Sequence, residues 1–136
     1  MSAFVIDASI ALAWCFEDEA SPGTDLVLEH VRDRGAIVPA LWHLELGNVL
    51  LQAEKRSRIA MAEIAARLEL IAALPIEVDQ ETTAHAWRET LALARAQGLT
   101  TYDAAYLELA VRRGIPLVTK DETLRVAAER LGVPTI

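Results

Sequence analysis

The chain has 136 residues, of which 53% are hydrophobic and 24% are charged. This length suffices for one domain with its own apolar core, over residues 1–136, and the composition is that of a folded protein rather than a disordered one. The net charge of −7 argues against a protein that holds nucleic acid by charge alone. An excess of carboxylates would equally suit a chain that binds cations, and composition does not decide between the two.

Short β-rich runs alternate with longer helical ones through the first half of the chain. Ser9 is expected to cap a helix after the first strand. Ser21 followed by Pro22 is typical of a helix start, and Gly35 is typical of a helix end. The predicted elements are strand 3–6, helix 9–18, helix 21–35, strand 36–38, helix 40–55 and helix 61–74.

The second half continues the alternation. Pro75 ends the preceding helix, Gly98 and Gly114 end two more, and Asp121 is expected to cap the last one. The predicted elements are strand 76–78, helix 80–97, helix 100–113, strand 116–119, helix 121–131 and an edge strand 133–136. Strands that alternate with helices predict an α/β fold, with a parallel sheet of about five strands flanked by helices.

Four acidic residues are expected to meet at one end of this sheet. Asp7 directly follows the first strand, and Asp121 follows the fourth. Ligand sites of open parallel sheets lie at the carboxyl ends of the strands. Asp103 begins a helix that runs back along the sheet, and Glu45 lies near the start of the helix after the second strand, so both belong near the same end.

Each acid also has a purely structural explanation. Asp7 and Asp121 are good helix caps, Asp103 suits a helix N-terminus, and Glu45 could face solvent. Together, however, four carboxylates in one crevice repel each other unless protons or a cation compensate their charge. Oxygen ligands suit a hard divalent ion such as Mg²⁺ or Mn²⁺, which can activate water against a phosphodiester.

Four short motifs surround these acids. Residues 4–9 contain Asp-x-Ser after a strand, and residues 39–50 contain a Glu with an Asn three positions later. Residues 101–106 hold the third acid, and residues 117–121 end in Thr-x-Asp. In this order, over nearly the whole chain, the motifs resemble those of the PIN-domain family and, within it, the VapC-like toxins of type II toxin–antitoxin systems.

The resemblance implies a three-layer PIN-like fold and a Mg²⁺-dependent endoribonuclease that hydrolyses RNA phosphodiester bonds with metal-activated water. It implies a homodimer that is silenced by a cognate VapB-like antitoxin at the active-site groove. Side chains beside the metal would orient the carboxylates or water. The implied metal ligands and catalytic residues are Asp7, Glu45, Asp103 and Asp121, with Ser9, Asn48 and Thr119 in support.

Other classes of protein were weighed against this hypothesis. A non-catalytic PIN-fold module that binds RNA or protein is the main alternative. A haloacid dehalogenase-type phosphatase needs a second Asp where Ser9 stands. The histidines offer no zinc-binding pair, Ser9 has no evident base, and the glycines form no phosphate-binding loop.

Other residues lead to further expectations. Cys15 is expected to be a buried thiol, and with no signal peptide or membrane span in view we expect a cytoplasmic protein. Lys120 and Arg125 flank Asp121 and are the best basic candidates for contact with RNA phosphates or an inhibitor. The apolar helix 61–74 is expected to lie mostly in the core, with part exposed for a partner. The three tryptophans are expected in the core or in a dimer interface: Trp14, Trp42 and Trp87.

Overall fold

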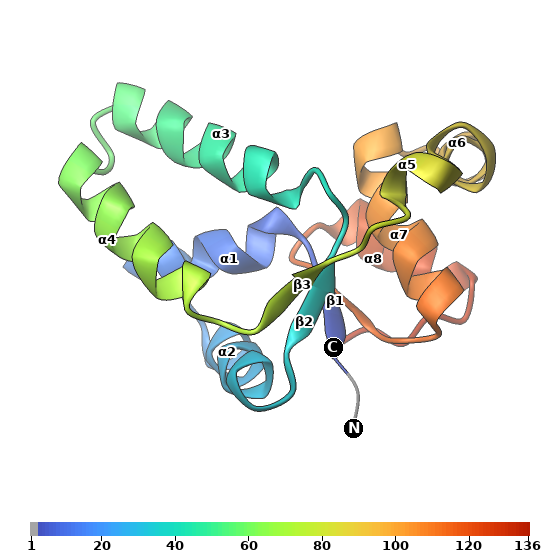
Figure 1. The fold of residues 1–136 in the computed structure, drawn as a ribbon, viewed down its shortest axis with the longest axis horizontal. Coiled ribbons are helices and arrows are strands. Elements are labelled where there is room, and N and C mark those ends of the chain that lie inside the picture. Colours follow the sequence, from blue (N-terminus) through green and yellow to red (C-terminus); the bar gives the residue numbers. More distant parts are fainter. Residues whose placement is uncertain (1–2) are drawn as a thin grey trace.

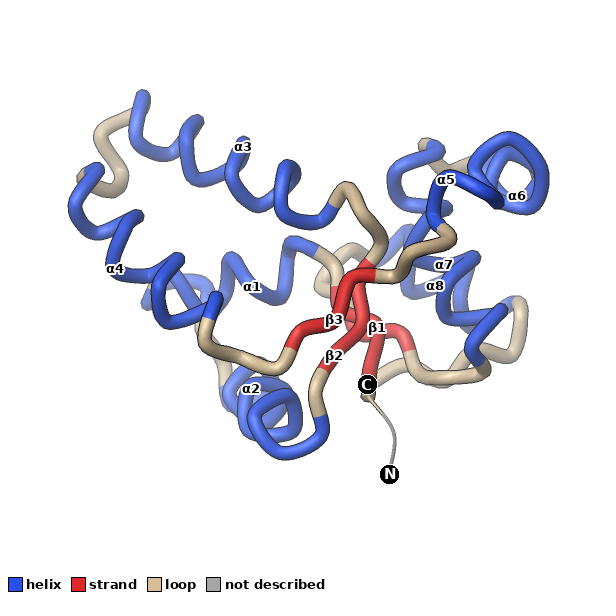
Figure 2. Tube along the Cα trace, in the orientation of Figure 1, coloured by secondary structure: helices blue, strands red, loops and turns tan. Residues whose placement is uncertain are grey.

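The computed structural model describes residues 3–136; Met1 and Ser2, which the expected domain includes, lie outside the described residues. At its centre is a parallel sheet with the strand order β3-β2-β1-β4 (Figures 1 and 2). The strands are short: β1 (Phe4–Ile6), β2 (Ala36–Val38), β3 (Ile76–Val78) and β4 (Leu117–Val118). The α/β fold with a parallel sheet between helices is therefore confirmed.

Helices lie on both sides of the sheet (Figure 1). From β1 to β3 the chain moves in one direction, and then it returns past β2 and β1 to reach β4. Because crossovers between parallel strands are right-handed, this reversal puts the later helices on the opposite face. One side holds α1 (Ala8–Cys15), α2 (Pro22–Arg34), α3 (Trp42–Lys55) and α4 (Met61–Ala72). The other side holds α5 (Thr82–His85), α6 (Leu91–Gln97), α7 (Thr101–Arg113) and α8 (Glu122–Arg130).

Helix α2 shows how local sequence sets these boundaries. The Ser21 hydroxyl accepts the Thr24 N–H at 3.1 Å, and the Thr24 hydroxyl accepts the Ser21 N–H at 2.9 Å. This capping box satisfies N–H groups that the first turn would leave unpaired. At the other end Gly35 has φ 83°, and a Cβ there would come within 2.9 Å of the Pro75 carbonyl oxygen. Both predicted ends of α2 are confirmed.

The core lies between the sheet and the two helical layers. All residues of β1 and β2 are buried, which agrees with their uninterrupted apolar sequences, because both faces of the sheet are covered. Trp42 of α3 and Leu107 of α7 pack into this core from opposite layers. Cys15 is also buried, as expected. No described helix is long and apolar enough to cross a bilayer.

The first helix differs from its prediction. It starts at Ala8 immediately after the strand and ends at Cys15, and a separate 3₁₀ turn covers Glu17–Glu19. Ser9 therefore lies inside the helix and is not its cap. Asp7 is in the capping position, with extended backbone angles, and the Ser9 hydroxyl bonds to its carboxylate instead.

Two elements of the second half also differ. The single helix expected over 80–97 begins at Thr82 and is divided by a π-helical turn, Ala86–Thr90. Apolar spacing predicts a helix but not its hydrogen-bond step, which packing against α7 sets here. The edge strand expected at 133–136 is a single bridge between Thr135 and Leu117. Pro134 has no N–H to extend this pairing.

Candidate functional site

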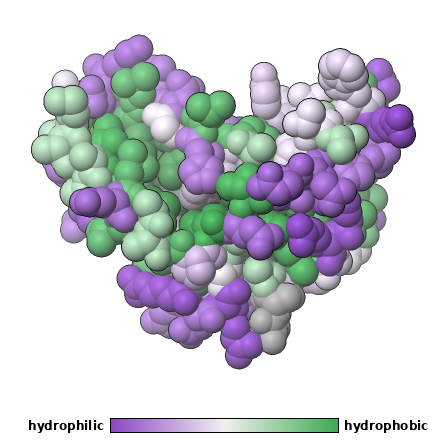
Figure 3. Space-filling model, in the orientation of Figure 1, coloured by the Kyte–Doolittle hydropathy of each residue, from purple (hydrophilic) through white to green (hydrophobic). Residues whose placement is uncertain are grey.

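The acidic residues lie at the carboxyl end of the sheet, where β1 and β4 are neighbours. The chain leaves β1 toward one layer and reaches β4 from the other, which makes this a topological switch point. Asp7 follows β1 and Thr119 follows β4. Figure 3 shows the surface hollowed between the α3–α4 side and the α5–α6 side.

Asp7 is the most buried of the four predicted acids, with 7% of its surface exposed. The Ser9 hydroxyl donates to its Oδ1 at 2.6 Å, and the Thr119 hydroxyl donates to its Oδ2. Each hydroxyl also accepts a backbone N–H from the turn after β4, Ser9 from Lys120 and Thr119 from Asp121, both at 2.9 Å. The two hydroxyl protons are thus directed at Asp7, and the carboxylate is fixed in place.

Glu45 lies in the first turn of α3 and is half-buried. The hydroxyl of Tyr106, from α7 in the opposite layer, donates to its Oε1. Burial, followed by the bond to Glu45, raises the pKa of Tyr106 far above its usual value, so the phenol keeps its proton. The two helical layers are therefore joined across the site by a carboxylate and its donor.

Asp103 and Asp121 are at helix starts. The Asp103 N–H is capped by the Thr100 hydroxyl at 3.1 Å, and its side chain is half-buried. Asp121 is exposed, and its Oδ1 accepts the Leu124 N–H at 3.1 Å as the cap of α8. Asn48 is exposed one turn after Glu45, and within residues 3–136 its side chain makes no hydrogen bond.

The acids are close enough for their charges to influence one another. Burial raises the pKa values of Asp7, Glu45 and Asp103, because it disfavours the charged form. Neighbouring charge raises them further: Asp103 acts on both Asp7 and Glu45, and Asp121 acts on Asp103. Within residues 3–136 no salt bridge reaches any of these three carboxyls. The site therefore holds negative charge without a basic side chain to balance it.

The donor set fits a hard divalent cation in chemistry and charge, since it consists of carboxylate oxygens that repel one another. Across the described part of the chain, however, no three His, Cys, Asp or Glu side chains are gathered closely enough to form a complete metal site. The structure thus shows an acidic group with mutual electrostatic coupling and no assembled coordination sphere.

Tyr106 was not assigned a role from the sequence, although it lies in the third motif. It is three residues after Asp103, a spacing that puts both on one face of α7 and could have identified it. Two expected basic contacts are engaged elsewhere: Lys120 Nζ donates to the Glu19 carbonyl at 3.0 Å, and Arg125 pairs with Glu122 and Glu129.

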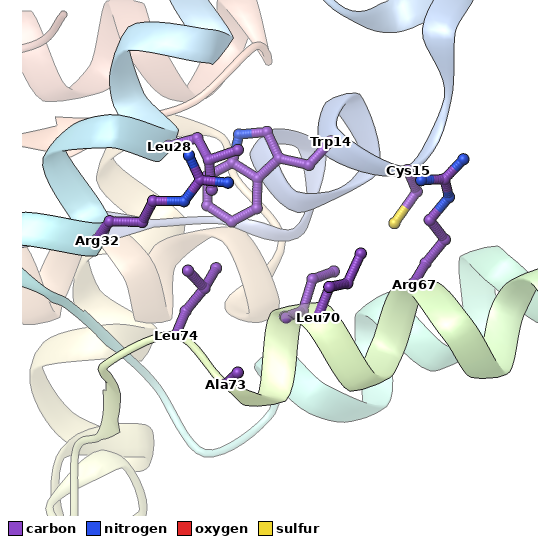
Figure 4. Close-up of a pocket in the computed structure, with 9 residues that line it drawn as sticks. Trp14, Cys15, Leu28, Arg32, Arg67, Leu70, Ala73 and Leu74 are labelled. Carbon is purple, nitrogen blue, oxygen red and sulfur yellow. The ribbon is translucent and has the colours of Figure 1, made fainter.

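An apolar cavity of about 360 Å³ lies apart from the acids, between α1, α2 and α4. Figure 4 shows Trp14 and Leu28 together on one side of it and Leu74 and Leu70 on the other. Its lining includes the guanidinium-bearing residues Arg32 and Arg67 but no carboxylate. It therefore offers no hydrolytic chemistry.

Comparison with known proteins agrees with this fold. The profile of the PIN domain matches residues 4–130. The chain belongs to the PIN-domain family. Among solved structures it is similar to the crystal structure of PAE2754 from Pyrobaculum aerophilum, with 25% identity and a TM-score of 0.72, covering 98% of this chain and 83% of that one. A search among curated proteins found no significant match.

Membership of this family gives the chain a nuclease-type fold. PIN domains are generally metal-dependent nucleases that use divalent ions, and the family suggests RNA as a ligand.

Proposed function

We propose that this protein is a Mg²⁺- or Mn²⁺-dependent endoribonuclease that hydrolyses RNA phosphodiester bonds. The observation that carries the proposal is the group of mutually coupled acids at the switch point. Burial raises their pKa values most, repulsion between the acids raises them further, and within residues 3–136 no salt bridge offsets this repulsion. Such repulsion is relieved either by protons or by a bound cation, and perturbed carboxyl pKa values of this kind cluster at functional sites.

In this proposal Asp7, Glu45 and Asp103 hold the cation, with Asp121 as a fourth acid directly or through water. Such an ion supplies Lewis acidity, which stabilises charge on a phosphodiester and makes water a better nucleophile. Hydrolysis then joins the oxygen of water to phosphorus and breaks the bond to a ribose oxygen, which receives the proton.

Other side chains keep the acids in position. Ser9 and Thr119 fix both oxygens of Asp7 through bonds that the turn after β4 orients. Tyr106 holds Glu45 from the opposite layer. Asn48, on the same helix as Glu45, is free to contact water or RNA near the site.

The proposal also accounts for the acidic composition. A chain with net charge −7 repels an RNA backbone. A bound divalent ion would offset much of the negative charge of the carboxylates and would attract a phosphate group to the site. RNA binding near the acids is then dependent on the metal, unlike binding through a basic groove.

We further propose that the protein is the cytoplasmic toxin of a toxin–antitoxin pair, a homodimer with a VapB-like antitoxin. Support comes from the exposed aliphatic side chains of α3 and α4, among them Leu44, Leu51 and Leu70. The cavity in Figure 4 adds two arginines beside apolar walls, which suits an apolar segment with acidic residues. Growth arrest on expression, relieved by a neighbouring small gene, would test this role.

The nuclease activity is tested with purified protein, RNA and Mg²⁺ or Mn²⁺. Asp7→Asn should reduce cleavage by more than about 100-fold, the upper range for residues that only orient a ligand, while leaving the circular dichroism spectrum unchanged. Asp25→Asn, in an exposed first turn of α2, is the matched control and should cleave normally.

Full activity of Asp7→Asn would contradict the mechanism. RNA binding that is equal with and without EDTA, and no cleavage with any divalent ion, would instead identify a non-catalytic binding module on the same fold.

A further inference from the structure

A second cavity, of about 480 Å³, opens beside the acids on the α5–α6 side. It is bounded by Trp87 and Leu91 on one side and by Tyr102 and Ala105 of α7 on the other, with Leu41 at the start of α3. Its volume lies within the roughly 300–1,000 Å³ of typical ligand clefts. The proposed nuclease chemistry uses none of these side chains.

The two aromatic rings of this cavity are exposed. Trp87 is 91% exposed and Tyr102 is 64% exposed, whereas Trp42 of the core is 1% exposed. Trp87 therefore does not lie in the core, where the sequence allowed it. A large ring that the fold leaves in water contributes little to stability. Its place beside a site makes it available to a ligand with a flat apolar face.

Two residues that line the cavity are close in sequence to the acids Asp103 and Glu45. Tyr102 directly precedes Asp103 on α7. The carbonyl of Leu41 accepts the N–H of Glu45 at 3.0 Å, so the rim of the cavity and the acid belong to the same turn. Both walls are thus attached to elements that carry carboxylates, and a ligand in the cavity would have its next group near the acids.

We propose that this cavity is a nucleobase subsite, in which an unpaired base of an RNA strand stacks between Trp87 and Tyr102. The inference rests on the proposed function and names its substrate class as single-stranded RNA. Proteins bind single strands by stacking bases on aromatic rings, at about 1–3 kcal/mol per base. In a chain with net charge −7, stacking would supply affinity that overall charge does not.

The surface elsewhere has a different chemistry. The exposed apolar side chains of α3 and α4 are aliphatic or Met, as with Leu44 and Leu68. Aliphatic faces suit a protein partner, whereas a base needs a ring. The aromatic pair therefore favours RNA over a second copy of the chain as the occupant.

The test uses an Asp7→Asn background, so that RNA is not cut, with Mg²⁺ and a single-stranded RNA oligonucleotide. The base should quench the fluorescence of Trp87. Trp87→Phe should abolish this quenching but keep the affinity within about threefold, because a ring remains. Trp87→Leu should weaken binding by at least about fivefold, the lower limit for loss of one stacked base. The same oligonucleotide in a duplex should bind less tightly.

Leu26→Ala, an exposed apolar residue on α2, is the control and should bind RNA as the parent does. Unchanged affinity of Trp87→Leu would overturn the subsite, as would a shift of that variant from dimer to monomer in sedimentation, which would assign Trp87 to a contact between copies. Cleavage by a Trp87→Leu protein with unchanged KM would sink the subsite but not the nuclease. If RNA quenches Trp87 but the wild-type protein cleaves no RNA with Mg²⁺ or Mn²⁺, the subsite stands and the proposed nuclease activity is wrong.

Discussion

Two buried carboxylates of this protein differ in whether a basic side chain neutralises their charge. Asp79, after β3, is 2% exposed, and Asp7, after β1, is 7% exposed. Arg112 of α7 donates two hydrogen bonds to the Asp79 carboxylate, at 3.1 and 2.7 Å, and Arg113 donates a third at 3.4 Å. Asp7 instead accepts hydrogen bonds from uncharged donors: the hydroxyls of Ser9 and Thr119 and the backbone of Ile10.

The pKa values follow this difference. Burial raises the pKa of Asp79, but the bonds and charges of Arg112 and Arg113 outweigh burial, and the net pKa is lowered. For Asp7, burial outweighs its hydrogen bonds, and the net pKa is raised. Asp79, which connects the edge strand β3 to α7, is thus paired with arginines. Asp7, at the switch point, is not. The site that lacks a built-in cation is the one suited to bind a metal ion.

Removing the cation at Asp79 should have the largest effect. Arg112→Met keeps the apolar stem but removes the bidentate partner of Asp79, which keeps only the longer contact to Arg113, and the partner of Glu108, which Arg112 binds at 2.8 Å. Loss of one member of a buried ion pair typically costs about 3–5 kcal/mol of unfolding free energy. Urea denaturation measures this loss. Arg95→Met, on an exposed position of α6, should change stability by less than about 0.5 kcal/mol. A similar small change in Arg112→Met would show that the cluster is not structural.

An intermediate effect is expected at the bridge between the layers. Tyr106→Phe removes the donor to Glu45 and preserves the ring. Residues that orient a metal ligand typically contribute about 10–100-fold to metal affinity or activity. We expect the Mn²⁺ concentration for half-maximal cleavage to rise by about tenfold. Tyr102→Phe, on an exposed ring one residue before Asp103, tests whether any phenol on α7 has this effect. An unchanged Mn²⁺ dependence in Tyr106→Phe would remove the residue from the site.

The smallest effect is on stability without metal. Because the folded state raises the pKa of Asp7, it holds that proton more tightly than the unfolded chain does. Stability therefore falls as pH rises from the ordinary carboxyl pKa of 3.8 through the raised value. In EDTA at pH 7, Asp7→Asn should be more stable than wild type by about 1 kcal/mol, seen as a few degrees in Tm. Asp79→Asn should be less stable, since a lowered pKa stabilises the fold at high pH. Destabilisation by Asp7→Asn would contradict the proposed difference between Asp7 and Asp79.

Much of the fold follows from local sequence. Gly35, Pro39 and Pro75 bound strands and helices where expected, and the Ser21 cap forms as predicted. The position of the acids also follows, since each comes directly after a strand or at a helix start. Parallel topology then brings those points to one edge.

The remainder depends on contacts between distant residues. Glu45 and Tyr106 are 61 positions apart, and Asp79 and Arg112 are 33 apart, so no local pattern links them. The π-helical turn that contains Trp87 packs against α7, which is distant in sequence, and the spacing of apolar residues does not predict it. The last strand reduces to one bridge because Pro134 limits its pairing.

Calorimetric titration of the wild-type protein with Mn²⁺ tests the central claim most directly. At about pH 5, just above ordinary carboxyl pKa values, part of the coupled acids should still hold protons. Mn²⁺ should then bind with a measurable release of protons, seen as a heat that varies with the ionisation enthalpy of the buffer. Asp7→Asn should bind at least about tenfold more weakly. Absence of Mn²⁺ binding to the wild type, or equal binding to both proteins, would contradict the account.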